Sequence, residues 1–174
     1  AKHWKVNDFL MMDIQQMKKY SFFKYIGVFS VNRSNPREAL GSIDYAATLL
    51  KDTGNFMWMF PQGEMLPQDR RPLSFFSGIT RIAEKLGKVN LLTVTIRYEF
   101  LMEQRPEVFM SLGKPDFPNS DIADSKEYTG YLEQKLTGEL DRLQKDVTEQ
   151  FTQDFKVIFH GKDSRNKTFD KIIE

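Results

Sequence analysis

The sequence predicts an α/β protein with a largely parallel or mixed central sheet, flanked by helices, and a long helix towards the carboxyl end. Short apolar runs alternate with amphipathic segments over residues 8–100, which is the order of crossover connections between parallel strands. Residues 125–152 repeat apolar side chains every three or four positions, the period of one helix with a single packed face. We expect one domain, 1–174, in which 125–174 is a helical extension.

The first elements follow from short apolar runs. Residues 8–12 are predicted to form a strand, and residues 13–27 an amphipathic helix that Gly27 ends. Residues 28–31, with the sequence VFSV, favour a second strand.

The next helix has clear boundary residues. Asn35 is suited to cap its amino end, Pro36 to occupy the first helical position, and Glu38 to complete a capping box. Gly54 follows its predicted end.

The remaining elements continue the alternation. Residues 56–60, FMWMF, predict a fully buried strand because the apolar run is continuous. A proline-containing loop, 61–72, leads to a helix over 74–88, with Ser74 or Ser77 as the cap. Residues 90–100 predict another strand, and 107–115 its hairpin partner.

Composition excludes several functional classes. The formal net charge is +1, from 25 basic and 24 acidic residues, so the sequence predicts no nucleic-acid binding. The chain has no cysteine and therefore no disulfide or thiol chemistry. No apolar run approaches the ~20 residues that cross a bilayer. The 15 Phe and 8 Met exceed the usual needs of a small core, so some are expected to face a lipid or an acyl chain.

Polar residues follow the predicted strands, where α/β sheets bind ligands. Asn32-Arg33 follow the second strand, Gln62-Gly63-Glu64 follow FMWMF, and residues 97–99 close the strand over 90–100. Arg70, Arg71 and the helix opening at Ser77-Gly78 add groups that could hold a phosphate. The alternative is that the arginines solvate the rim, and that Gly63 serves only a turn with positive φ.

The segment YSFFKYIG, residues 20–27, has two interpretations. Its apolar side chains suit the buried face of a helix, which the pattern favours. Alternatively, they form an amphipathic surface with Lys18, Lys19 and Lys24, suited to an anionic membrane.

Four stretches together carry a family resemblance: FFKYIGVFSVNR, PREAL, FMWMFPQGE and DRRPLSFFSGITRIAEKLGKVNLLTVTIRYEF. They resemble the glycerolipid acyltransferase family, typified by bacterial 1-acylglycerol-3-phosphate acyltransferases, over roughly residues 10–115. The resemblance implies an α/β fold and an acyl-transfer activity.

The resemblance also suggests site residues. The family block GV(I/F)xVDR matches residues 27–33, with Asn32 in place of Asp, and implies that Arg33 contacts the phosphate of the acceptor. The block FPEGTRS is replaced here by Phe60-Pro61-Gln62-Gly63-Glu64, in which Gln62 stands for an acid. Glu64-Met65 stand where the family has Thr-Arg. Arg70 or Arg71 could supply the missing arginine of this block.

The family's catalytic pair is a His-x4-Asp motif, in which the His is the general base. His3 and Asp8 match it only by spacing, because the family places more residues between this motif and Phe22. The catalytic residues are therefore unknown, and we expect the motif upstream of a chain that is truncated at its amino end.

The resemblance implies transfer of a fatty acyl group from acyl-CoA or acyl-carrier protein to a hydroxyl of a lysophospholipid or related polar lipid. No metal or cofactor is expected, and the protein is expected to sit peripherally on the cytoplasmic face of a membrane. The alternative is a non-catalytic lipid-binding or membrane-surface module with the same fold. A phosphate-ester hydrolase has no matching cluster of nucleophiles or metal ligands in the sequence.

Overall fold

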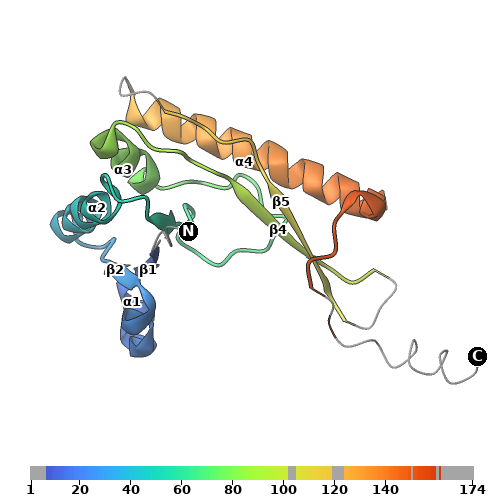
Figure 1. Ribbon diagram of the computed structural model, residues 1–174, viewed down its shortest axis with the longest axis horizontal. Helices are drawn as coiled ribbons and strands as arrows, with labels where there is room; N and C mark the ends of the chain where they lie inside the picture. Colours follow the sequence, from blue (N-terminus) through green and yellow to red (C-terminus); the bar gives the residue numbers. More distant parts are fainter. Residues whose placement is uncertain (1–6, 102–104, 119–123, 150, 160, 162–174) are drawn as a thin grey trace, which may run out of the picture. The chain divides into compact units, whose positions relative to one another are not determined.

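The computed structural model of the protein describes residues 7–101, 105–118, 124–149, 151–159 and 161 (Figure 1). The chain divides into two compact units. Unit 1 comprises Ala1–Leu91 and Asp116–Glu133, and unit 2 comprises Leu92–Pro115 and Gln134–Glu174. Each unit contains its own sheet.

Unit 1 is built on a three-stranded parallel sheet. Its strands are β1 (Asp8–Asp13), β2 (Val28–Val31) and β3 (Phe56–Trp58), in the order β2-β1-β3. The expected α/β class is confirmed, since crossover connections link these parallel strands.

Two helices cover one face of this sheet: α2 (Pro36–Leu50) and α3 (Gly78–Leu86). Ile43 and Ala46 of α2 and Ile82 of α3 form a buried cluster, and partly buried side chains from all three strands pack against it. The predicted cap of α2 is confirmed, because Asn35 Oδ1 accepts a hydrogen bond from the Arg37 backbone N–H at 3.1 Å.

The prediction of a fully buried strand over residues 56–60 is wrong. Phe56, Trp58 and Phe60 are each more than half exposed, whereas Met57 and Met59 pack against the α2–α3 cluster. The strand is only three residues long and lies at the edge of a small sheet, so alternate side chains point away from the helices. Although the apolar run is continuous, only one face of this strand is covered by the helices, and the other face is exposed.

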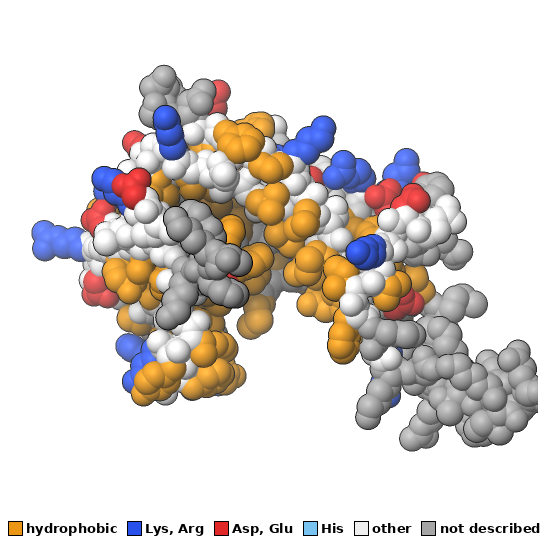
Figure 2. Space-filling view, in the orientation of Figure 1, with side chains coloured by type: hydrophobic (Ala, Val, Ile, Leu, Met, Phe, Trp, Pro, Cys, Tyr) orange, Lys and Arg blue, Asp and Glu red, His pale blue; other side chains and the backbone are white. Residues whose placement is uncertain are grey.

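The single helix predicted over residues 13–27 is also wrong in part. The structure has a short helix, α1 (Ile14–Lys19), followed by a 3₁₀-helix, η1 (Ser21–Ile26), which Gly27 ends with φ +83°. Neither element has a buried residue, so the interpretation of this segment as core is contradicted (Figure 2). Aromatic residues are weaker helix formers than Leu or Ala, and no packed face compensates here.

The described part of unit 2 contains a β-hairpin, the second part of a long helix and a short 3₁₀-helix. Strands β4 (Val94–Glu99) and β5 (Glu107–Leu112) pair in an antiparallel sheet, which confirms the predicted hairpin. Helix α4 (Ser125–Thr148) belongs to unit 1 as far as Glu133 and to unit 2 beyond it. Phe109, Leu143 and Val147 form the buried cluster of unit 2, ahead of the short helix η2 (Phe151–Asp154).

The placement of residues 90–100 in a crossover sheet is corrected by this pairing. β4 is not a member of the parallel sheet, because its hydrogen-bonded partner is β5. The connection from Glu99 to Glu107 is too short for a crossover, which favours an antiparallel return.

Candidate functional site

The candidate site lies at the edge where the three parallel strands of unit 1 end. Asp13 is the last residue of β1, Arg33 follows β2, and Gly63 follows β3. The carboxyl ends of parallel strands meet at one edge, so three segments distant in sequence come together there. The predicted gathering of Arg33 with the Gly63 turn is therefore present in the fold.

Three neighbours hold the Arg33 side chain. Its Nε donates to Asp13 Oδ2 at 3.3 Å in a salt bridge. The guanidinium carbon lies 5.1 Å from the centre of the Phe76 ring, a cation–π arrangement. Its Nη1 lies against the backbone of Gly63. The Arg33 side chain remains 32% exposed, so the group is positioned and still accessible to an anion.

Two physical reasons favour glycine at position 63. Its φ is +64°, a conformation that side-chain-bearing residues adopt at a cost. A Cβ at this position would lie 2.6 Å from Arg33 Nη1, so the guanidinium would have to move from its present place. Gly63 thus forms a turn with positive φ, as one of the two interpretations predicted, and the side chain that closely approaches its backbone is Arg33.

The turn is tied to the start of α3. Gly63 N donates to Phe60 O and Phe76 N donates to Pro61 O, both at 2.9 Å. These bonds place the Phe76 ring beneath Arg33, two residues before α3 begins. The opposite neighbour, Asp13, is held because its Oδ1 caps α1 by accepting from Gln15 N at 2.8 Å.

Gln62 and Glu64, the two departures from the family block, behave differently from Gly63. The Gln62 amide donates to Leu73 O at 2.9 Å, so this side chain braces the following loop. Glu64 is exposed to solvent. Asn32, the third departure, donates to Glu38 Oε2 at 2.8 Å and supports the start of α2.

Arg70 and Arg71 lie in the loop before α3. Arg71 Nη1 donates to the carbonyls of Gln68 and Arg70, at 3.1 and 2.9 Å, and so helps to shape its own loop. Arg70 is exposed. The role of Arg70 or Arg71 in binding a phosphate stays a prediction.

The prediction that residues 97–99 belong to the same edge is wrong. Arg97 is buried within unit 2, and its Nη2 forms a salt bridge to Glu99 Oε1 at 2.9 Å. Its strand pairs with β5, so the carboxyl end of β4 is not part of the parallel-sheet edge.

The two residues that match the family's catalytic pair by spacing, His3 and Asp8, are not seen beside Arg33 among the described residues. Asp8 begins β1 and pairs with Phe56 at the start of β3, so it lies at the edge opposite Arg33. His3 and His160 lie outside the described residues. Burial, followed by the neighbouring Asp116 carboxylate, raises the pKa of Tyr128 above its usual range.

Two residues of this site have no role in the sequence-based prediction. Asp13 falls inside the helix predicted over residues 13–27, yet it is the first polar residue after the apolar run of β1 and therefore occupies a strand end, like Asn32 and Gln62. Phe76 lies in the fourth of the stretches that carry the family resemblance, but its contact with Arg33 depends on the backbone hydrogen bond to Pro61. The place of Asp13 at a strand end is the sequence signal that marks it as a candidate, whereas its pairing with Arg33 is visible only in the fold.

Within the described ranges, no three His, Cys, Asp or Glu side chains gather closely enough to hold a metal ion. The expectation of no cofactor stays a prediction. Among the same residues, no helix combines the length and apolarity needed to cross a membrane.

Comparison with known proteins identifies the class. The model of the Acyltransferase family matches residues 11–97, which is half of the chain, and the chain therefore belongs to that family. The matched residues include Asp13, Arg33, Gly63 and Phe76. Membership supports acyl transfer as the activity, and so implies an acyl donor and a lipid acceptor. No curated protein and no solved structure matched the chain.

Proposed function

We propose that the protein transfers a fatty acyl group from a thioester, acyl-CoA or acyl-carrier protein, to a hydroxyl of a lysophospholipid or related polar lipid. The observation that carries this proposal is the accessible Arg33 guanidinium at the strand-end edge, inside the stretch that matches the family. A fixed, planar cation with free N–H donors suits the phosphate of such an acceptor. The proposed place of action is the cytoplasmic face of a membrane.

In this reaction the acceptor oxygen attacks the thioester carbonyl. A carbon–oxygen bond forms, the carbon–sulfur bond breaks, and the hydroxyl proton ends on the departing thiol. Arg33 would hold the acceptor phosphate, with Asp13 and Phe76 fixing the orientation of the guanidinium. Asp13 is bonded to Arg33 and Gln15, so we assign it a positioning role.

The general base is proposed to be the His of a His-x4-Asp motif, as the family resemblance implies. Neither histidine of the chain, His3 or His160, is among the described residues. Reading the gene upstream of Ala1 for this motif is the direct check of that part of the proposal.

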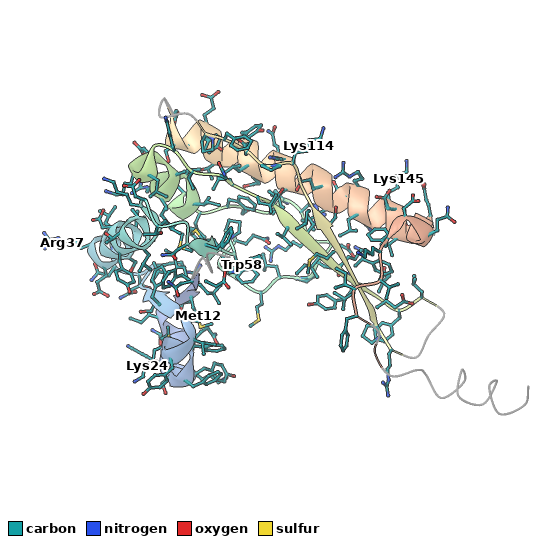
Figure 3. All side chains as sticks on the ribbon, in the orientation of Figure 1. Met12, Lys24, Arg37, Trp58, Lys114 and Lys145 are labelled. Carbon is teal, nitrogen blue, oxygen red and sulfur yellow. The ribbon has the colours of Figure 1, made fainter. Side chains whose placement is uncertain are left out.

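The proposal is tested by measuring acyl transfer to lysophosphatidic acid from acyl-CoA and from acyl-carrier protein, with Arg33→Ala and Arg37→Ala compared. Losing charge-assisted hydrogen bonds to the phosphate is expected to lower kcat/KM about 10- to 150-fold in Arg33→Ala. Arg37 projects outwards from α2 and serves as the matched control, which should keep full activity (Figure 3). Undiminished acyl transfer by Arg33→Ala would contradict the assignment of Arg33 to the acceptor phosphate.

A second candidate, a non-catalytic lipid-binding module, is favoured by one observation. Gln62 stands where the family has an acid, and its amide is engaged with Leu73 O. A protein of this kind would bind lysophosphatidic acid with a dependence on Arg33 while transferring no acyl group from either donor. Measuring binding and turnover on the same preparation separates the two candidates.

A further inference from the structure

One surface of unit 1 combines exposed aromatic groups with lysines. We call residues 18–26 the basic aromatic segment; it comprises the end of α1 and the whole of η1. Its exposed large apolar side chains are Tyr20, Phe22, Tyr25 and Ile26. Tyr25 is 79% and Ile26 64% exposed, so these side chains cost free energy in water unless something covers them.

The charges of this segment have one sign. Lys18, Lys19 and Lys24 are exposed, and no acidic residue occurs between Ile14 and Gly27. Figure 2 shows hydrophobic side chains and lysines together on this part of the molecule, where α1 lies in Figure 1. The surface is therefore complementary to one that is apolar inside and negatively charged at its boundary.

Two of the three lysines lie against aromatic rings. Lys19 Nζ is 5.1 Å from the ring centre of Tyr20, and Lys24 Nζ is 4.9 Å from that of Tyr25. Such pairs keep each ammonium beside a ring that could enter the headgroup region, which is how long basic side chains act at membrane interfaces.

The segment is already shaped in the folded chain. Phe22 and Phe23 stack with ring centres 4.3 Å apart, and Gly27 ends η1 in the left-handed conformation. Because the aromatic cluster is ordered before binding, less conformational entropy is lost when it meets a partner.

From these observations we propose that the basic aromatic segment inserts into the headgroup and upper acyl region of an anionic lipid bilayer. Tyr25 and Ile26 enter, and the three lysines contact the lipid phosphates. This inference deepens the proposed function, on which it rests for the lipid acceptor. The last two residues of α1 belong to this segment, and Asp13, which caps the other end of α1, forms the salt bridge to Arg33. One short helix therefore links the proposed membrane contact to the acceptor site.

The chain contains no cysteine, so a single introduced thiol can be labelled selectively. An environment-sensitive fluorophore on Tyr25→Cys or Ile26→Cys should brighten and shift to the blue with vesicles of phosphatidylcholine and phosphatidylglycerol. The matched control is Ile158→Cys in unit 2, at a position that is 87% exposed. Its emission should stay that of a probe in water. Equal changes at all three positions would overturn the assignment to this segment.

Vesicle flotation measures the contribution of each part. The triple change Lys18→Gln, Lys19→Gln and Lys24→Gln should weaken binding about fivefold per lysine at low salt. Tyr25→Ser with Ile26→Ser should weaken binding about tenfold or more, because two large apolar side chains are lost. The control pair, Val157→Ser with Ile158→Ser, alters side chains of similar exposure and should bind like the unaltered protein.

Three results would overturn the inference: no binding of the unaltered protein to anionic vesicles, equal binding to neutral vesicles, or an equal loss in the control pair. Self-association that disappears in Tyr25→Ser with Ile26→Ser would instead assign the surface to a second copy of the chain. Circular dichroism checks that each variant is folded. Vesicle binding needs no acyl donor, so binding without acyl transfer contradicts only the proposed reaction, and transfer without binding contradicts only this inference.

Discussion

Arg33 shows how a single side chain is made useful by its neighbours. An isolated surface arginine samples many rotamers, and ordering it costs conformational entropy. Here Asp13, Phe76 and the Gly63 backbone restrict the guanidinium while leaving part of it open. The pair with Asp13 is partly exposed and contributes little to stability on its own. The contribution of this salt bridge is to orient the Arg33 guanidinium.

For this residue cluster we predict that Gly63→Ala damages the site more than the fold. The left-handed conformation should cost about 1–2 kcal/mol of unfolding free energy, and the new Cβ should displace Arg33. Gly54→Ala is the control, because Gly54 has φ +70° and a Cβ there would meet no atom within 4 Å. Denaturant unfolding should show similar losses for both variants, and lysophosphatidic acid binding should fall only in Gly63→Ala. Equal binding by the two variants would contradict the contact with Arg33.

The elements of unit 1 are positioned by their ends. The turn between β2 and α2 is held by Glu38, which accepts from Asn32 at Oε2 and from Asn35 at Oε1. Arg33 lies within this turn, so the start of α2 also determines where the site's cation emerges. Ser42 Oγ then donates to Ser30 O at 3.1 Å and fixes α2 against β2.

For this element, Asn35→Ala is expected to lower the unfolding free energy by about 0.5–2 kcal/mol, because the cap to Arg37 N is lost. Thermal and denaturant unfolding measure the change. The neighbouring Ser34→Ala removes an exposed side chain outside the cap and should change stability by less than about 0.5 kcal/mol. A larger effect in Ser34→Ala than in Asn35→Ala would refute the capping role.

At the scale of the molecule, the described part of the chain builds two hydrophobic clusters. One gathers Ile43, Ala46 and Ile82 over the parallel sheet, and the other gathers Phe109, Leu143 and Val147 beside the hairpin. α4 contributes residues to both units: its first part, up to Glu133, belongs to unit 1 and the rest to unit 2. A two-stranded hairpin is marginal alone, and the second cluster is what stabilises it.

We therefore predict that Leu143→Ala, at a position only 2% exposed, lowers stability by about 2–5 kcal/mol through loss of packing. Hydrogen exchange should show reduced protection first in β4 and β5, while β2 keeps its protection. Leu112→Ala is the matched control, because Leu112 is 63% exposed. Uniform loss of protection across both units would show that they unfold as one.

Local signals in the sequence are enough to predict the α/β class, the hairpin, the start of α2 and the gathering of Arg33 with the Gly63 turn. The end of α2 was placed too late, because the helix stops at Leu50 and not just before Gly54. These features depend on periodicity, capping residues and strand ends, which the chain carries wherever it folds. The family blocks pointed to the same class, and the match over residues 11–97 established it.

Other features depend on the assembled fold. Burial of a side chain depends on which elements cover it, so FMWMF became a half-covered edge strand and YSFFKYIG an exposed aromatic surface. The partners of Arg33 are 20 residues away at Asp13 and farther still at Phe76, and no pattern along the chain encodes such pairings. They arise because parallel strands bring their carboxyl ends to one edge, which only the assembled sheet provides.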